Sequence, residues 1–221
     1  MIERIPEPEL MGEEAQARAY SEADFAEPHD NFVAQFLERF PRLPVGAQVL
    51  DMGCGPADIT CRFARAIPEC RIDGVDGAAA MLRFGEQRVQ DSGLGGRIRL
   101  IEGYLPGATL PRERYEVLIS NSLLHHLPDP QTLWSTVNRH AAAGAIVFIM
   151  DLMRPASRER AQALVDHYTA GEPEVLRRDF YHSLLAAFTP AEVQTQLTAA
   201  SLGQLELEVI NDRHLIVSGR I

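Results

Sequence analysis

Apolar positions between residues 45 and 153 alternate between two spacings. Short apolar runs that are typical of buried strands alternate with segments in which apolar residues recur at helical spacing. The expected strands are 49–52, 71–75, 98–102, 115–120 and 145–152, and the expected helices are 57–66, 79–90 and a segment that Asp129 caps with Pro130 at its first position. This alternation predicts a mostly parallel sheet with helices on both faces.

The pattern changes on either side of this region. The first 30 residues are polar and helix-prone, and Asp30 or Asn31 is expected to cap a helix that presents an apolar face and ends at Pro41 and Pro44. After Pro155 come two helical stripes, 161–171 and 176–185. Thr189-Pro-Ala-Glu192 reads as a capping box that opens another helix. Two β-like runs, 205–210 and 214–218, close the chain around a turn and predict an antiparallel pair.

These elements predict a single α/β domain. We expect a three-layer αβα arrangement with a mostly parallel seven-stranded sheet, a C-terminal antiparallel hairpin, N-terminal helices and a helical insertion after the fifth strand. The expected parts are an N-terminal helical cap (1–44), a ligand-binding core (45–153), the helical insertion (154–188), and the last helix with the hairpin (189–221).

Charge and composition narrow the choice of partner and compartment. The net charge is -10 and there is no basic tract, which argues against nucleic acid. The longest apolar run, 141–150, is too short to cross a membrane. The three cysteines are odd in number and lack a paired metal-binding spacing, so we expect reduced thiols in a cytoplasmic protein and no metal site. The histidines are scattered, and the side chains of adjacent His125 and His126 are expected to point in different directions.

The main chemical clue is the loop Asp51-Met-Gly53-Cys-Gly55, which follows the first expected strand. Glycines at such a turn let a ligand lie against bare backbone, beyond the carboxyl end of the strand. The next strand ends in Asp76, 21 positions after Gly55. An acid at this spacing reaches the hydroxyls of a ribose.

A dinucleotide is the first alternative ligand, but the charges here disfavour it. A dinucleotide-binding fingerprint has a third glycine where this chain has Asp58. A pyrophosphate at this helix start would face that carboxylate. Asp51 also precedes the glycines, where it can meet a cation. S-adenosylmethionine carries an ammonium and a sulfonium and no phosphate, so the pattern favours it. An ordinary glycine-rich turn with two structural acids is the remaining alternative.

Four segments together resemble the motifs of class I S-adenosylmethionine-dependent methyltransferases, a Rossmann-like family. They are 49–56 (Val-Leu-Asp-Met-Gly-Cys-Gly-Pro), 74–82 (Gly-Val-Asp-Gly-Ala-Ala-Ala-Met-Leu), 115–130 around Asn-Ser-Leu-Leu-His-His, and 144–151 (Gly-Ala-Ile-Val-Phe-Ile-Met-Asp). The expected reversed hairpin at the C-terminus also matches this family. The resemblance implies a methyltransferase that uses S-adenosylmethionine and releases S-adenosylhomocysteine after in-line displacement.

The resemblance also implies roles for individual residues. Asp51, Gly53 and Gly55 are expected at the methionine part of the cofactor, Asp76 at the ribose, and the Asn121 carbonyl at the ammonium. Many members carry an acid after Glu-Gly in the third-strand motif, where this chain has Tyr104, so Tyr104 is expected to border the adenine instead. The remaining expected cofactor residues are Cys54, Gly77, Met81, Gly103, Leu105 and Ser122.

The acceptor side is less defined. A general base is needed only when the acceptor is protonated at neutral pH. His126 is a candidate base or orienting group, and Arg154 is a candidate partner for an acceptor carboxylate or phosphate. Tyr181, in the insertion that is expected to form the acceptor lid, and Tyr20 near the N-terminus are the further catalytic candidates. Tyr20, Asp24, His29 and Asp30 are expected on a helix that covers the cofactor. Packing, capping or surface roles are the alternatives, for His125 as well.

We therefore expect transfer of a methyl group to a small-molecule acceptor, without nucleic acid or membrane as partner. A homodimer is the candidate oligomeric state. A nicotinamide-dependent oxidoreductase is the enzymatic alternative, and a protein that binds S-adenosylmethionine without turnover is the non-enzymatic one. A nucleic-acid or protein methyltransferase is disfavoured by the charge.

Overall fold

The sheet has the strand order β3-β2-β1-β4-β5-β7-β6 in a computed structural model that describes residues 2–7, 18, 20, 21 and 26–221. The strands from β3 to β5 are parallel to their neighbours, and β7 is antiparallel to both β5 and β6. The strands are β1 (Gln48–Met52), β2 (Arg71–Asp76), β3 (Ile98–Glu102), β4 (Tyr115–Asn121), β5 (Ala141–Leu152), β6 (Glu206–Val209) and β7 (His214–Arg220). The expected mostly parallel sheet with a reversed terminal hairpin is confirmed.

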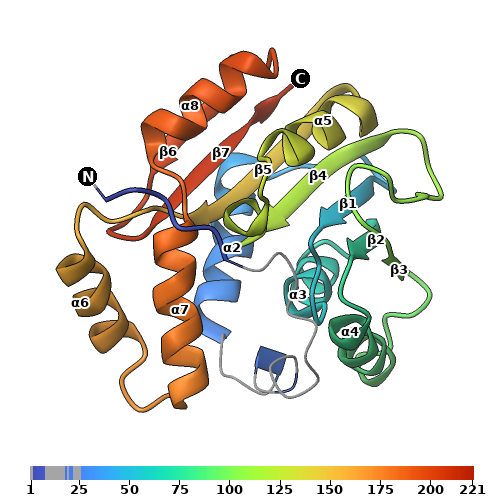
Figure 1. Cartoon of the computed structure of the whole chain (residues 1–221). Coiled ribbons are helices and arrows are strands. Elements are labelled where there is room, and N and C mark those ends of the chain that lie inside the picture. The colour runs from blue at the N-terminus through green and yellow to red at the C-terminus, as the bar shows by residue number, and fades with distance from the viewer. Residues whose placement is uncertain (1, 8–17, 19, 22–25) are drawn as a thin grey trace.

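Helices cover both faces of this sheet, as Figure 1 shows. They are α2 (Ala26–Arg39), α3 (Asp58–Ala66), α4 (Ala79–Asp91), the short η1 (Leu124–His126), α5 (Gln131–His140), α6 (Arg158–Tyr168), α7 (Glu174–Ala186) and α8 (Pro190–Ala199). One apolar core lies under α2 and α3, and a second lies under α5 and α8. The Rossmann-like three-layer arrangement is therefore confirmed.

The two cores follow from the alternation of side chains along the strands. In β5, Phe148 belongs to the first core and its neighbour Ile149 to the second, and both are fully buried. Phe36 of α2 packs against Phe63 and Phe148, with ring centroids 4.7 and 5.5 Å away. On the opposite face, Trp134 of α5 is fully buried in the second core. A central strand buried on both faces explains the continuous apolar run in its sequence.

Helices α6 and α7 form the expected insertion between β5 and α8. They share a third apolar cluster, which includes Leu164 of α6, Leu184 of α7 and Leu152 at the end of β5. The predicted capping box at the start of α8 is confirmed, because the Thr189 side chain accepts from the Glu192 amide and the Glu192 side chain accepts from the Thr189 amide. The part boundaries named above, and the role of the insertion as a lid, stay predictions.

Three element boundaries differ from expectation. The described part of helix α2 already includes Ala26 and Pro28, so the helix extends before the expected caps Asp30 and Asn31. Helix α5 begins one residue later than expected, so Pro130 is its N-cap while the Asp129 side chain accepts from the Gln131 amide. Strand β5 begins at Ala141 rather than 145, with a register shift against β4 that apolar periodicity does not reveal.

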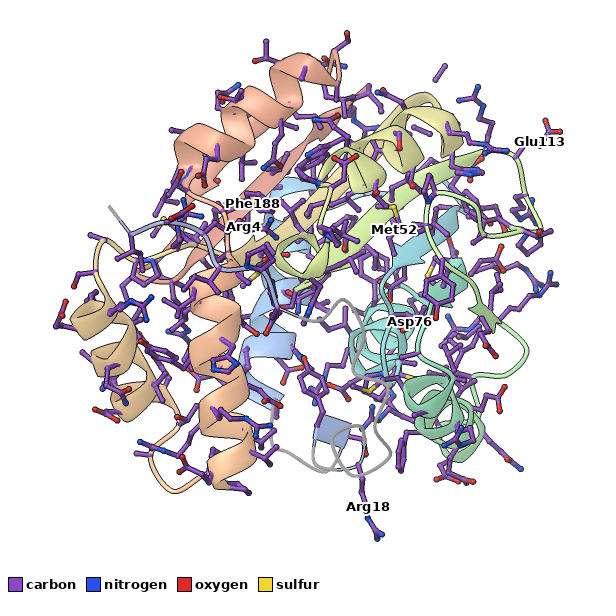
Figure 2. The ribbon with its side chains drawn as sticks, viewed as in Figure 1. Arg4, Arg18, Met52, Asp76, Glu113 and Phe188 are labelled. Carbon is purple, nitrogen blue, oxygen red and sulfur yellow. The ribbon has the colours of Figure 1, made fainter. Side chains whose placement is uncertain are left out.

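The N-terminal strap, which we define as residues 2–7, passes over the C-terminal end of α7 (Figure 1) and is hydrogen-bonded both to that end and to the η1 turn. Arg4 donates to the carbonyls of Ala186, His125 and Leu127 at 2.6, 2.9 and 3.0 Å. Its guanidinium also lies 3.9 Å from the centre of the Phe188 ring, and Figure 2 shows the two side chains together. The strap therefore connects the η1 turn to the insertion.

Candidate active site

The carboxyl ends of the parallel strands meet at one edge of the sheet. Strand β1 is central. The strands that follow it, β2 and β3, are added on one side, and β4 and β5 are added on the other side, so the strand order reverses between β1 and β4. Ligands of open α/β sheets bind at such a reversal point, outside the carboxyl ends of the strands. Figure 2 shows Asp76 at the end of β2, near Met52 at the end of β1. The loops that follow β1, β2, β3 and β4 all line one cavity at this edge.

The glycine loop after β1 is held in a conformation that disfavours side chains. Gly53 and Gly55 have φ values of 73° and 50°, and a Cβ atom built on Gly53 would lie 2.9 Å from Leu123 Cδ1. The Gly53 and Cys54 amides donate to the Val75 carbonyl at 2.8 and 3.1 Å. Nothing lies within 4 Å of a Cβ on Gly55. The loop thus presents open backbone to the cavity, which is what a closely bound ligand requires.

Two carboxylates flank this loop. The Asp76 oxygens accept from the amides of Gly55 and Ala78, both at 2.8 Å, which fixes the carboxylate while leaving acceptor capacity on each oxygen. The Asp51 carboxylate accepts from the Thr60 hydroxyl at 2.6 Å and is 3% exposed. Burial raises the pKa of Asp76, and burial together with the nearby Asp76 charge raises the pKa of Asp51 to about 7. A ligand cation would restore the charged form of Asp51.

The structure places all of the expected cofactor residues around this one cavity. Its empty volume is about 1050 Å³, which includes the part open to solvent. Tyr104, which replaces the acid of the family pattern, is 56% exposed at the cavity wall. The expected residues that line the cavity are Asp51, Gly53, Cys54, Gly55, Asp76, Gly77, Met81, Gly103, Tyr104, Leu105, Asn121 and Ser122.

Asp58 also lines the cavity, but its charge is more compensated than the sequence suggests. Its Oδ2 lies 2.6 Å from His29 Nδ1 and accepts from Arg62 Nε at 2.7 Å, and Arg88 Nε lies 3.7 Å from Oδ1. Burial alone raises the pKa of Asp58, but the hydrogen bonds from His29 and Arg62 outweigh it and hold the pKa well below its ordinary value. Asp58 is therefore an ionised, paired carboxylate, and its repulsion of a pyrophosphate is weaker than the sequence argument assumed.

His125 anchors the turn that follows β4. It is 2% exposed, and its Nδ1 lies 2.6 Å from the Asp151 carboxylate at the end of β5. The same carboxylate accepts from the amides of Leu124 and Leu152, each at 2.7 Å. Burial lowers the pKa of His125, but the Asp151 charge and hydrogen bond outweigh it and raise the pKa. These contacts hold η1 against the sheet.

The other candidates near the acceptor side divide into two groups. His126 and Tyr20 line the cavity, as does His29, and burial raises the pKa of Tyr20 to about 12. Asp30 instead pairs with Arg62 at 2.5 Å on the surface, and Asp24 lies outside the described residues.

Arg154 and Tyr181 are not among the residues that line the cavity, and their role towards the acceptor stays a prediction. Arg154 donates to the Ala187 carbonyl at 2.9 Å and to the Glu192 carboxylate at 2.6 Å, so it joins the end of β5 to the cap of α8. Tyr181 packs against the cluster between α6 and α7. Arg154 thus contacts the capping box of α8, and Tyr181 contacts the apolar cluster of the insertion.

Glu7 is a functional candidate that the sequence did not reveal. Its Oε1 lies 3.3 Å from His126 Nδ1 and 3.5 Å from His125 Nε2, and it accepts from the Ser183 hydroxyl at 3.0 Å. The two histidine rings are 4.2 Å apart with planes 35° from parallel. The expectation that the adjacent histidines point apart is therefore wrong: the 3₁₀ turn directs both towards the strap. No local pattern around Glu7 signals this contact, which depends on the whole fold.

Within the described residues, no helix has the length and apolar character needed to cross a membrane.

Comparisons with known proteins match this geometry. A family model described as "Methyltransferase domain" matches residues 49–144. An uncharacterized methyltransferase of Mycobacterium tuberculosis is 28% identical over 156 residues, which is 70% of this chain and 76% of the relative. The trans-aconitate 2-methyltransferase of an Azoarcus species is 30% identical over 125 residues, which is 57% of this chain and 46% of the relative.

The fold extends the likeness beyond the matched segment. The crystal structure of a SAM-dependent methyltransferase from Aquifex aeolicus superposes with a TM-score of 0.69 and 16% identity, covering 95% of this chain and 98% of that chain. At this identity the superposition shows the shared fold. The sequence match covers the glycine loop, Asp76 and the β4 turn, which are the segments that build the cavity. Residues 49–144 therefore match a methyltransferase domain in sequence, and the chain as a whole shares the fold of a SAM-dependent methyltransferase.

Proposed function

We propose that this methyltransferase binds its cofactor between the glycine loop and Asp76 and transfers the methyl group to a small molecule that enters beside His126. The observation that carries the proposal is the cavity with Asp51 and Asp76 at either side of open loop backbone. Asp51 and the Asn121 carbonyl suit the ammonium, and Asp76 suits the ribose hydroxyls. The apolar Met81 and the exposed Tyr104 suit the adenine.

When bound, S-adenosylmethionine would supply an electrophilic methyl group for in-line transfer to the acceptor, with S-adenosylhomocysteine as the leaving group. Positioning of the acceptor supplies much of the rate. Leu123 and Leu127 line the cavity and limit water there. His126 is proposed to orient the acceptor or to take its proton. Tyr20, with its pKa near 12, stays protonated at neutral pH and is proposed to donate a hydrogen bond.

A small acceptor is supported by two observations. The chain's net charge of -10 disfavours a polyanion, and one of the relatives described above is named for the small molecule trans-aconitate. The cavity is lined by residues of a single chain, so the proposal does not depend on a homodimer. We also propose a cytoplasmic location, which the free state of Cys54, Cys61 and Cys70 supports.

Calorimetry with S-adenosylhomocysteine tests the cofactor site. Asp51→Asn and Asp76→Asn are each expected to weaken binding by about tenfold or more, which corresponds to about 1.4 kcal/mol or more. Asp91→Asn is the matched control, because Asp91 is exposed at the end of α4 and contacts Gln87. Unchanged affinity in both cavity variants, or a thermal shift with NAD that exceeds the shift with S-adenosylhomocysteine, would contradict the proposal.

The acceptor class is tested separately with isotope-labelled cofactor. A screen of small thiols, amines, hydroxyls and carboxylates is expected to yield a labelled product with the wild-type chain and less product with His126→Asn. Tight cofactor binding without transfer to any class would instead favour a binding protein that lacks turnover.

A further inference from the structure

Glu7, His125 and His126 bring three metal-ligating atoms together beside the cofactor cavity. The carboxylate oxygen of Glu7 lies 3.3 Å from His126 Nδ1 and 3.5 Å from His125 Nε2, and all three ligand atoms lie within 4.8 Å of one another. Two ligands that are each about 2.1 Å from one ion are about 3.0 Å apart at a right angle and about 3.4 Å apart in a tetrahedron. The two measured separations are close to these values.

The same distances fit direct hydrogen bonds less well. Charge-assisted N–H···O bonds are short, at about 2.7–2.9 Å. The contact between His125 Nδ1 and Asp151, at 2.6 Å, shows that this region can form such a short bond. The Glu7 oxygen stands farther from both ring nitrogens while remaining in hydrogen-bond contact with Ser183. The arrangement therefore suits a shared cation better than two direct hydrogen bonds.

The surroundings of the three side chains also match a metal site. A metal-ligating histidine usually donates its other ring N–H to a carboxylate or carbonyl, which fixes its tautomer. His125 has this partner in Asp151, so its Nε2 is left to face Glu7. Asp151 is itself held by two backbone amides. The Ser183 hydroxyl of α7 donates a hydrogen bond to Glu7. The two most buried ligands, His125 and Glu7, therefore each have a hydrogen-bond partner outside the site.

Burial and charge are compatible with one divalent cation. The side chains of His125, Glu7 and His126 are 3%, 9% and 14% exposed. The charged groups around them are the carboxylates of Glu7, Asp151 and Asp179 and the Arg4 guanidinium, whose Nη2 bonds the His125 carbonyl. With neutral histidines these groups sum to two negative charges. Two imidazoles and one carboxylate favour Zn²⁺ and similar transition metals over Mg²⁺ and Ca²⁺, which prefer oxygen ligands.

We propose that Glu7, His125 and His126 form a binding site for one divalent transition-metal ion of the Zn²⁺ type. Three protein ligands leave a coordination position open, which is the arrangement of catalytic rather than structural zinc sites. His126 and Leu127 line the cavity, so the open position faces the acceptor side and would take water or an anionic atom of the acceptor. The inference rests on these side chains alone and does not depend on the identity of the acceptor.

Metal titration of the 221-residue chain tests the proposal without any acceptor. After treatment with a chelator and dialysis, calorimetry with Zn²⁺ is expected to show one equivalent bound. Co²⁺ is expected to give a visible d–d spectrum without the intense near-ultraviolet band of a thiolate ligand. Glu7→Gln and His126→Asn are each expected to weaken binding by at least about tenfold, and Asp151→Asn by about 10- to 100-fold through its outer contact.

His167→Asn is the matched control, because His167 is exposed on α6 and contacts Tyr168 rather than this site. It is expected to keep the single equivalent. Circular dichroism checks that each variant folds. His126→Asn is the variant expected to disturb packing least, because His126 is the most exposed of the three ligands. Three results would each overturn the site. They are the absence of stoichiometric binding to the wild type, wild-type affinity in both the Glu7 and the His126 variants, and a thiolate band that assigns the ion to cysteine.

Discussion

At the residue scale, Asp51 is the group whose protonation most directly links the cavity to pH. Its pKa is raised to about 7 because the carboxylate is buried and faces Asp76, although the Thr60 hydroxyl partly offsets this. A folded-state pKa above the ordinary value means that the native chain holds a proton that the unfolded chain releases. The contribution of Asp51 to stability is therefore fully present at low pH and is lost as pH rises through its folded pKa.

Cofactor binding should respond to pH in the opposite direction. The ammonium of S-adenosylhomocysteine favours the ionised form of Asp51, so affinity is expected to increase from about pH 5 to about pH 8 with release of a proton. Calorimetry in two buffers of different ionisation enthalpy measures both quantities. Asp51→Asn is expected to bind weakly and to lose much of this pH dependence. An equally steep dependence in the variant would assign it to another group.

The sequence indicated which residues line the cavity where these residues lie at a strand end. Asp51, Asp76 and Asn121 each lie at the carboxyl end of a strand of the parallel sheet, so their positions at one edge follow from the alternation of strands and helices. Glu7 could not be found in this way, because it reaches the histidines only through a contact 118 positions away in the chain (125 minus 7). The partner of Arg154 could not be found in this way either, because Glu192, the carboxylate that it contacts, lies 38 positions further along the chain.

At the element scale, α8 depends on its N-terminal cap. Thr189 and Glu192 satisfy each other's backbone amides, and the helix packs on α5, where Trp134 donates to the Gln196 side chain at 3.0 Å. Thr189→Ala removes one of these bonds and is expected to lower the free energy of unfolding by about 1 kcal/mol. Denaturation in urea measures the loss.

The control for this variant is Thr195→Ala in the same helix. Thr195 is exposed and its hydroxyl bonds the Ala191 carbonyl within the helix, so its loss should leave stability nearly unchanged. Cofactor affinity is expected to stay at the wild-type value in both variants, since α8 lies away from the cavity. A stability loss in Thr195→Ala as large as that in Thr189→Ala would show that the cap has no special role.

The helices and strands themselves were predictable because periodic burial is a local property of sequence. Their boundaries were less so. Helix α2 includes Pro28, before the expected cap, and the start of β5 depends on a register shift against β4. Neither is recorded in the spacing of apolar residues. The capping box of α8 was the exception, since its residue types alone specify the geometry.

At the scale of the whole molecule, the N-terminal strap connects parts of the fold that are far apart in sequence. Arg4 bonds carbonyls of the η1 turn and of the end of α7, and Ile5 donates to the Leu185 carbonyl at 3.1 Å. Arg4→Ala leaves these carbonyls without their partner, which is expected to destabilise the chain by about 1–3 kcal/mol. Hydrogen exchange is expected to increase in residues 124–127 and 184–188.

Arg42→Ala provides the comparison, because Arg42 is an exposed residue between α2 and β1. Mass spectrometry should find its exchange pattern unchanged in both segments. If the Arg4 variant also exchanges like the wild type there, the strap adds little to the stability of the acceptor side.

The burial of the three cysteines affects how fast their thiols react with electrophilic reagents. Burial raises the pKa of Cys54 well above its ordinary value, raises that of Cys61, and raises that of Cys70 to about 11. Because the thiolate is the reactive form, alkylating reagents are expected to react very slowly with these thiols in the folded chain. Thiol labelling therefore requires local or global opening of the structure. Since Cys54 lies in the glycine loop, its labelling rate reports how often that loop separates from β2.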